Sequence, residues 1–114
     1  MAAIDVVQRQ LAAYNARDLE RFLAEFHDTV QVFRPPAAQP VISGKAALAE
    51  FYATQRFNRP ALHAEIVGRV VMGQRIIDHE RIHGLQDQPS EMVVVFDVVG
   101  ERILTMWAFA PLEP

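Results

Sequence analysis

The spacing of apolar residues changes partway along the chain, and this change is the strongest constraint on its fold. In the first half, one apolar stripe repeats at helical intervals, at Ile4, Val7, Leu11 and Tyr14. After Pro60, apolar and polar residues alternate as they do in β-strands. Helices followed by a run of antiparallel strands predict an α+β domain in which the helices pack on a sheet.

Capping and breaking residues divide the first half into three predicted helices. The first helix ends near Asn15, and Asp18 is a suitable N-cap for a second helix whose buried face includes Phe26. A third helix is expected from Lys45 to about Gln55. A short strand is expected at 30–33, and turns near 73–74, 84–90 and 100–101 separate the later strands.

Composition excludes several classes of function. The 114 residues, taken as one domain over 1–114, carry a net charge of -3 and no cysteine. No basic footprint for nucleic acid is visible, and disulfides and thiol chemistry are excluded. No secretory signal and no apolar run long enough for a membrane span are visible, so a cytoplasmic protein without nucleic-acid or membrane partners is expected.

The segment from Leu62 to Gly84 predicts a hairpin with a two-residue turn at Gly73-Gln74. Regular pairing then sets five small or apolar residues against three titratable or cationic ones. The first set is Ala64, Ile66, Gly68, Val70 and Met72, and the second is His79, Arg81 and His83. Such a face is typical of a pocket wall with free space above it.

This polar row is the predicted catalytic set, with His79 and His83 as bases and Arg81 as an anion clamp. The alternative is that the row lies on an outer face as ordinary solvated residues. The two histidines are four residues apart on a strand, about 13 Å at ~3.3 Å per residue, so they cannot chelate one ion. We therefore expect no metal, and no cofactor.

The last predicted hairpin, with its turn at Gly100-Glu101, is apolar on both faces. Regular pairing groups Val94, Phe96, Val98, Ile103, Trp107 and Phe109 on one face, and Val93, Val95, Asp97, Leu104, Met106 and Ala108 on the other. Because helices cover only one side, the face with Val94, Phe96, Trp107 and Phe109 is predicted to form a homodimer.

Three segments resemble the nuclear transport factor 2-like superfamily, in its SnoaL-like and ketosteroid isomerase-like branch. They are VVQRQLAAYNARDLERFLAEF (6–26), VQVFRPP (30–36) and SGKAALAEFYA (43–53), with weaker matches at ERIHG (80–84) and GERILTMWAF (100–109). The resemblance implies a cone-shaped α+β barrel, with helices against a curved, mostly antiparallel sheet that encloses an apolar cavity, usually as a dimer.

The catalytic residues of well-known relatives do not carry over. Similarity to ketosteroid isomerase would put its tyrosine at Gln10, its general base at Arg34 and its acid near Val95, and none of the three residue types matches. Asp97 would restore the last position only in a shifted register. Similarity to limonene-epoxide hydrolase keeps an arginine at Arg81 but replaces both aspartates, with histidine at 83 and alanine at 108.

The sequence therefore predicts a pocket protein for a small apolar molecule that carries a polar or anionic group. Predicted ligand contacts are Tyr14, Arg34, Met72, Val93, Val95, Asp97, Met106 and Ala108. One alternative is a cofactor-independent isomerase, hydrolase or cyclase that uses histidine for proton transfer. Another is a protein-interaction module without catalytic activity.

Overall fold

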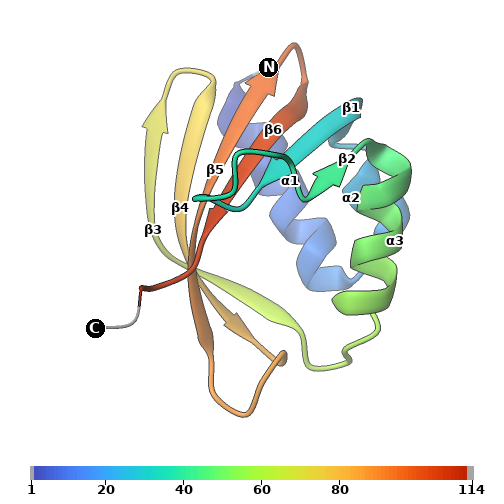
Figure 1. The fold of residues 1–114 in the computed structure, drawn as a ribbon, viewed down its shortest axis with the longest axis vertical. Helices are drawn as coiled ribbons and strands as arrows, with labels where there is room; N and C mark the ends of the chain where they lie inside the picture. Colours follow the sequence, from blue (N-terminus) through green and yellow to red (C-terminus); the bar gives the residue numbers. More distant parts are fainter. Residues whose placement is uncertain (1, 113–114) are drawn as a thin grey trace.

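The computed structural model describes residues 2–112, in which three helices pack on one face of a curved six-stranded sheet (Figure 1). The helices are α1 (Ala3–Ala16), α2 (Leu19–Leu23) and α3 (Lys45–Gln55). The strands are β1 (Phe26–Phe33), β2 (Ile42–Ser43), β3 (His63–Met72), β4 (Arg75–His83), β5 (Ser90–Val99) and β6 (Arg102–Phe109). The predicted α+β class is confirmed.

The strand order is β2-β1-β6-β5-β4-β3, and every neighbouring pair is antiparallel except β1 with β6. Strands β3 to β6 follow one another along the chain and are neighbours in the sheet. The first strand, β1, pairs with the last strand, β6, and β2 pairs with β1 at the edge of the sheet.

Local capping explains where the first two helices end and begin. The chain leaves α1 through Arg17, whose left-handed backbone (φ 54°) lets its N–H donate to the carbonyls of Ala13 and Tyr14. The Asp18 side chain then accepts a hydrogen bond from the Arg21 N–H and caps α2. The second helix is shorter than predicted, because Phe26 begins β1 instead of lying on a helix face.

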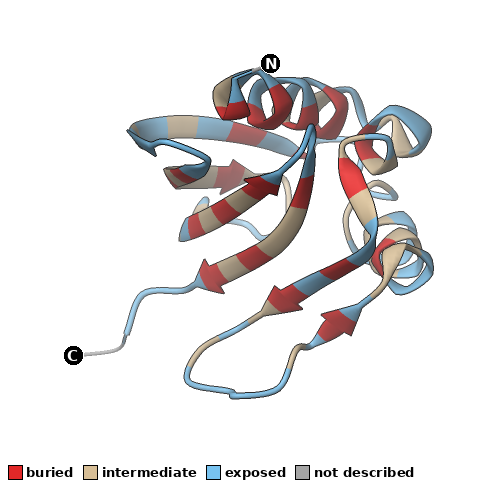
Figure 2. Cartoon of the chain, turned by 90° about the horizontal axis from the view of Figure 1, so that it is seen from above, coloured by how far each residue is buried: buried red, intermediate tan, exposed pale blue. Residues whose placement is uncertain are grey.

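The hydrophobic core fills the space between the inner face of the sheet and the helices (Figure 2). Buried residues alternate with more exposed ones along β4, β5 and β6, as expected for strands with one covered face. The largest fully buried side chains include Phe22, Phe26, Phe96, Leu48 and Leu62. Each such side chain stabilises the fold by roughly 1.5–3 kcal/mol relative to an exposed one.

Two register shifts decide which side chains face this core. The first lies in the β3–β4 hairpin, where the pairing skips Val67, and the second in the β5–β6 hairpin, where it skips Leu104. A bulge adds one residue to one strand and bends the sheet, so beyond it every side chain changes faces relative to regular pairing. The regular pairings predicted for both hairpins therefore hold near the turns and fail beyond the bulges.

Polar contacts attach α1 to the β3–β4 hairpin. The Asn15 side chain accepts a hydrogen bond from the Ala64 N–H at 2.8 Å and donates one to the Ala64 carbonyl at 3.1 Å. Arg69 binds Asp78 with two hydrogen bonds, at 2.6 and 2.9 Å, and also donates to Gln8 of α1.

Within residues 2–112, no helix is both long and apolar enough to cross a membrane.

Candidate functional site

A cavity of about 50 Å³ lies between the sheet and the helices. Its apolar walls come from α1, α3, β1, β2, the strands β4 to β6 and the loop after β4. They comprise Leu11, Val32, Ile42, Phe51, Ile82, Leu85, Met92, Val94, Phe96, Met106 and Ala108. This volume holds only a few water-sized groups, because a cavity needs about 10–15 Å³ for each water.

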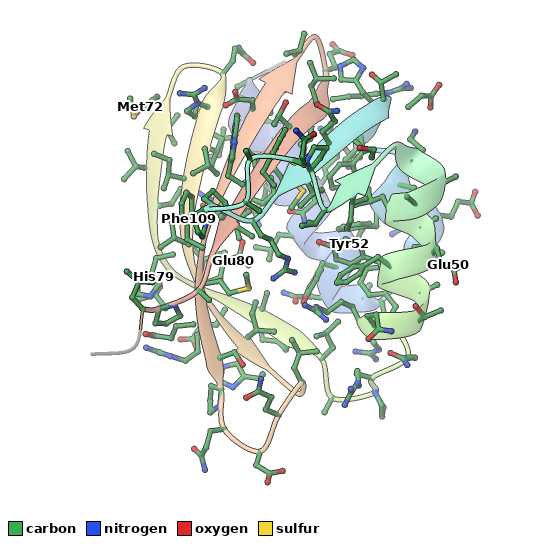
Figure 3. The ribbon with its side chains drawn as sticks, in the orientation of Figure 1. Glu50, Tyr52, Met72, His79, Glu80 and Phe109 are labelled. Atoms are coloured by element: carbon green, nitrogen blue, oxygen red, sulfur yellow. The ribbon has the colours of Figure 1, made fainter. Side chains whose placement is uncertain are left out.

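Four polar side chains from three elements also line this cavity. Gln10 and Tyr14 lie one turn apart on α1, Tyr52 comes from α3, and Glu80 comes from the inner face of β4. In Figure 3, Tyr52 and Glu80 lie in the space between α3 and the sheet. The Tyr14 and Tyr52 rings meet edge to face, with centroids 6.2 Å apart.

The polar ends of these side chains are largely free of protein partners. Gln10, Tyr52 and Glu80 make no side-chain hydrogen bond to any residue in 2–112, whereas the Tyr14 hydroxyl interacts with Arg56. Within this range, no side-chain polar atom is both sealed from solvent and unpaired. The three free polar ends therefore reach the cavity space, where a ligand or water can bind them.

Glu80 is the most perturbed ionisable group in the cavity. Burial and, to a smaller extent, the neighbouring Asp78 carboxylate raise its pKa to about 8, against the opposing effect of Arg69. The side chain is therefore mostly a neutral carboxylic acid at pH 7. In that state it both donates and accepts a hydrogen bond, and it exchanges a proton near neutral pH.

The two tyrosines are hydrogen-bond donors at any physiological pH. Burial raises the pKa of Tyr52 to about 12, and burial raises the pKa of Tyr14 above its ordinary range. Their hydroxyls, the Gln10 amide and the Glu80 acid form a neutral, hydrogen-bonding inner end. This arrangement suits a carbonyl or hydroxyl group on an otherwise apolar molecule.

A wider hollow of about 590 Å³ adjoins the cavity and forms its mouth. Arg34, Arg56, Leu85 and Met92 line both spaces. Arg34 follows β1, and Arg56 caps the C-terminal end of α3, where its guanidinium lies 4.9 Å from the centroid of the Phe51 ring. The mouth therefore has two cationic side chains on a border that mixes apolar residues with Gln86, Ser90 and Glu91.

Half of the predicted ligand contacts line this cavity. Tyr14, Arg34, Met106 and Ala108 do so, and their role in binding stays a prediction. The other four lie on the opposite, outer face of the sheet: Met72, Val93, Val95 and Asp97. Their placement in the cavity was wrong. The bulge at Leu104 brings Met106 and Ala108 to the face of Val94 and Phe96 instead of that of Val93, Val95 and Asp97, and Met72 lies opposite Arg75 on the outer face.

The predicted catalytic row also lies on the outer face. His79, Arg81 and His83 alternate along β4 with the inward residues Asp78, Glu80 and Ile82. Figure 3 shows His79 on the other side of the sheet from Glu80. The cavity assignment was wrong because the bulge at Val67 sets Ile66 opposite Glu80, and Ala64 opposite Ile82.

On the outer face, the row forms a half-exposed ionic network. The Arg81 guanidinium lies 3.0 Å from the Glu91 carboxylate and 3.7 Å from that of Glu65. His83 Nε2 lies 3.1 Å from a Glu65 oxygen, and His79 Nε2 lies 3.5 Å from a Glu91 oxygen. These contacts hold the three side chains away from the cavity.

The residues predicted for a dimer face do not share one face of the sheet. Val94 and Phe96 are buried on the inner face, with 5% and 1% of their surface exposed, so their placement was wrong. Trp107 and Phe109 do lie on the outer face, where Trp107 stacks on Phe33 with centroids 6.1 Å apart.

Sequence reasoning missed Gln10, Tyr52, Arg56 and Glu80 as site residues. The signal for Glu80 was present, because Ile76 and Ile82 share its face of β4, and a strand buries its aliphatic face.

For a metal, no group of three or more histidine, cysteine, aspartate or glutamate side chains converges within residues 2–112.

The fold and the enclosed cavity define an NTF2-like α+β protein. The model of the SnoaL-like domain matches residues 7–106, so the chain belongs to the SnoaL-like domain family. Three solved structures illustrate the fold. A cystatin-fold protein from Novosphingobium aromaticivorans has a TM-score of 0.83 and 21% identity, with 95% of this chain and 97% of that chain covered.

The second is a candidate ketosteroid isomerase from Kribbella flavida, with a TM-score of 0.82 and 20% identity, covering 98% of this chain and 81% of that one. The third is a computationally designed 17-OHP binder, with a TM-score of 0.82 and 17% identity, covering 98% and 94%. At these identities the likeness establishes the shared fold alone.

Proposed function

We propose that the protein binds a small, mainly apolar molecule in the cavity, with the ligand's polar group at the inner end. The observation that carries the proposal is the set of free polar ends at Gln10, Tyr52 and Glu80 inside an apolar enclosure. Unpaired polar groups in such a place lower stability unless something binds them. A ligand with a hydrogen-bonding group at the inner end offers a partner to these side chains.

A thermal-unfolding screen against lipophilic ketones, carboxylic acids, epoxides and sterols tests this proposal. A ligand at 100 times its dissociation constant adds about 2.7 kcal/mol to the free energy of unfolding. In a domain of this size that raises the unfolding midpoint by several degrees. Absence of any hit would contradict the proposal and favour an interaction module.

Two variants show whether a hit binds in the cavity. Gln10→Leu removes the amide from the inner end while keeping a helix-forming residue of similar size, and it should reduce the shift. His79→Leu changes the outer face of the sheet and should leave the shift unchanged. Equal losses in both variants would mean that the ligand does not bind at the inner end.

A second candidate function is proton-transfer catalysis by Glu80, which replaces the histidine-based alternative. A mostly buried carboxyl with a pKa near 8 is suited to take a proton from a carbon beside a carbonyl and to return it elsewhere. The Tyr14 and Tyr52 hydroxyls support this by offering hydrogen bonds to the carbonyl oxygen.

Deuterium exchange tests the catalytic candidate directly. A carbonyl compound found in the screen is incubated in D₂O with the protein, and mass spectrometry follows deuterium at the carbon beside the carbonyl. The unmodified protein should accelerate the exchange, and Glu80→Gln should abolish the acceleration while still binding the compound. Equal exchange rates with both proteins would remove Glu80 from the chemistry.

We also propose that two copies associate through the outer face of the sheet. A central row of apolar side chains crosses this face, at Val70, Ile77, Val95, Trp107 and Phe33. On one side it is bordered by the Arg75–Asp97 pair (2.6 Å) and on the other by the Arg81–Glu91 pair (3.0 Å). An apolar centre with a charged border is typical of a protein interface.

Sedimentation velocity tests the association. Trp107→Glu should yield monomers, because it sets a charge in the centre of the apolar row. Ala47→Glu adds the same charge on the exposed side of α3 and should leave the dimer intact. A dimer that survives Trp107→Glu would rule out this face.

A further inference from the structure

Two arginines at the cavity mouth, Arg34 and Arg56, combine a position in the cavity lining with the lack of a carboxylate partner among residues 2–112. Among the described residues, the arginine and lysine side chains in ion pairs are those of Arg9, Arg21, Lys45, Arg69, Arg75 and Arg81, and all of these lie outside the cavity lining. Arg34 and Arg56 are the cationic side chains that line the cavity and its mouth together.

The acidic residues around these arginines do not neutralise them. Glu91 borders the mouth, but its carboxylate binds Arg81 at 3.0 Å and lies 3.5 Å from His79 on the outer face. Glu80 lies deeper, and burial together with the Asp78 carboxylate keeps it mostly neutral at pH 7. The mouth is therefore electropositive, whereas the inner end is polar and neutral.

The two guanidinium groups come from different elements but act on the same interior. Arg56 interacts with the Tyr14 hydroxyl and is partly held by its hydrogen bond to the Gln55 carbonyl and by the Phe51 ring. Arg34 and Arg56 both oppose the rise in the pKa of Tyr52, which means that both charges are felt at the same hydroxyl. Because both arginines line the cavity and its mouth, an anion where the two spaces join would lie near both guanidinium groups.

We propose that the ligand class is an amphipathic organic monoanion, held by its carboxylate between Arg34 and Arg56 and inserted with its uncharged end first. The inference rests on the proposed function, because it assumes that the cavity binds a small molecule. Guanidinium groups bind carboxylates with charge-assisted, often bidentate hydrogen bonds. The neutral inner end, by contrast, disfavours a second charge.

The sizes of the two spaces restrict the shape of this ligand. The inner cavity of about 50 Å³ accepts a short apolar or carbonyl-bearing end, and the mouth of about 590 Å³ accepts the larger part. Short-chain and single-ring carboxylic acids fit this division. A dianion with charges at both ends would place one of them beside Glu80 and the apolar walls, at high desolvation cost.

The test is a titration-calorimetry comparison of matched charged and neutral probes at pH 7. The probes are carboxylates that carry a methyl ketone at the far end, namely 4-oxopentanoate, 5-oxohexanoate, 6-oxoheptanoate and 4-acetylbenzoate, each paired with its primary amide. At least one carboxylate should bind ten-fold or more tightly than its amide. Arg34→Gln and Arg56→Gln should each weaken the carboxylate by about ten-fold and leave the affinity of the amide unchanged.

A matched control and three outcomes separate the two proposals. Arg102→Gln removes an exposed arginine outside the cavity lining and should leave both affinities unchanged. If amides bind as well as carboxylates, or if both arginine variants retain full carboxylate affinity, the anion assignment is overturned while the pocket function stands. If neither class binds, the pocket function itself fails.

Discussion

Glu80→Gln should remove most of the pH dependence of stability that the cavity creates. Glutamine keeps the size of the side chain and resembles the protonated acid, but it does not titrate. In the folded protein the Glu80 pKa is raised from an ordinary value of 4.5 to about 8. Between these two values the folded protein keeps a proton that the unfolded chain has released.

The sign and size of the effect follow from this difference in bound protons. The contribution of Glu80 to stability is complete below about pH 4.5 and is lost as the pH rises toward 8. Its slope is about 1.4 kcal/mol per pH unit, so the unfolding free energy should fall by about 2.7 kcal/mol between pH 5 and pH 7. The difference in unfolding free energy between the unmodified protein and Glu80→Gln should therefore change with pH at this slope.

Other ionisable groups contact or surround the same space. Their contributions to the pH dependence cancel when the unfolding free energies of the two proteins are subtracted. They are Asp78 and Arg69 on the neighbouring strand positions, Tyr14 on α1, Tyr52 and Arg56 on α3, and Arg34 after β1. All are present in both proteins. The control is Glu50→Gln, which removes an exposed carboxyl that points away from the cavity (Figure 3).

Urea unfolding followed by tryptophan fluorescence at pH 5, 6, 7 and 8 measures these free energies. The unmodified protein should lose stability relative to Glu80→Gln at each step, whereas the Glu50→Gln curve should not reproduce that loss. A flat difference between the unmodified protein and Glu80→Gln would show that Glu80 is ionised in the folded protein. The neutral inner end would then be refuted.

Two further changes test the structural basis of the site by urea unfolding. Arg69→Ala should lower the unfolding free energy by about 3–5 kcal/mol, because it leaves the Asp78 carboxylate buried without its partner. Gly84→Ala should destabilise the protein far more than Gly100→Ala. Both glycines have positive φ angles, which cost an alanine about 1–2 kcal/mol, but at Gly84 the added Cβ would also lie 2.3 Å from the Ala61 carbonyl oxygen. Similar losses for the two glycine variants would contradict the close approach.

The elements that sequence predicts well are those set by local chemistry. The stripe from Ile4 to Tyr14 formed α1, Lys45–Gln55 is a helix with the predicted bounds, and the turn at 73–74 lies where a Gly-first pair suggested. In each case neighbouring residues alone determine the backbone. Phe26 departed from this because its apolar side chain suits the buried face of a helix and of a strand equally well.

The site was predicted less well because two bulges separate local pattern from tertiary position. Val67 and Leu104 are residue types common in regular strands, so their side chains do not predict that the strand pairing skips them. Each bulge is a property of the curved sheet and its packing on the helices. Since a one-residue slip reverses the faces of a strand, two such residues were enough to put Glu80 in the cavity in place of His79, and Val94 in place of Val95.

The energetics of the inner end favour a bound ligand over a role in packing. Keeping the Glu80 carboxylate charged in the cavity would cost about 5 kcal/mol, from a pKa raised by about 3.5. Total stabilities of domains are about 5–15 kcal/mol, so this is a large fraction. Apolar residues at Gln10, Tyr52 and Glu80 would close the cavity and avoid the desolvation of polar groups. A protein that used only the outer face of its sheet would gain stability from that change, whereas a protein that recognises a polar group inside the cavity would lose its means of recognition.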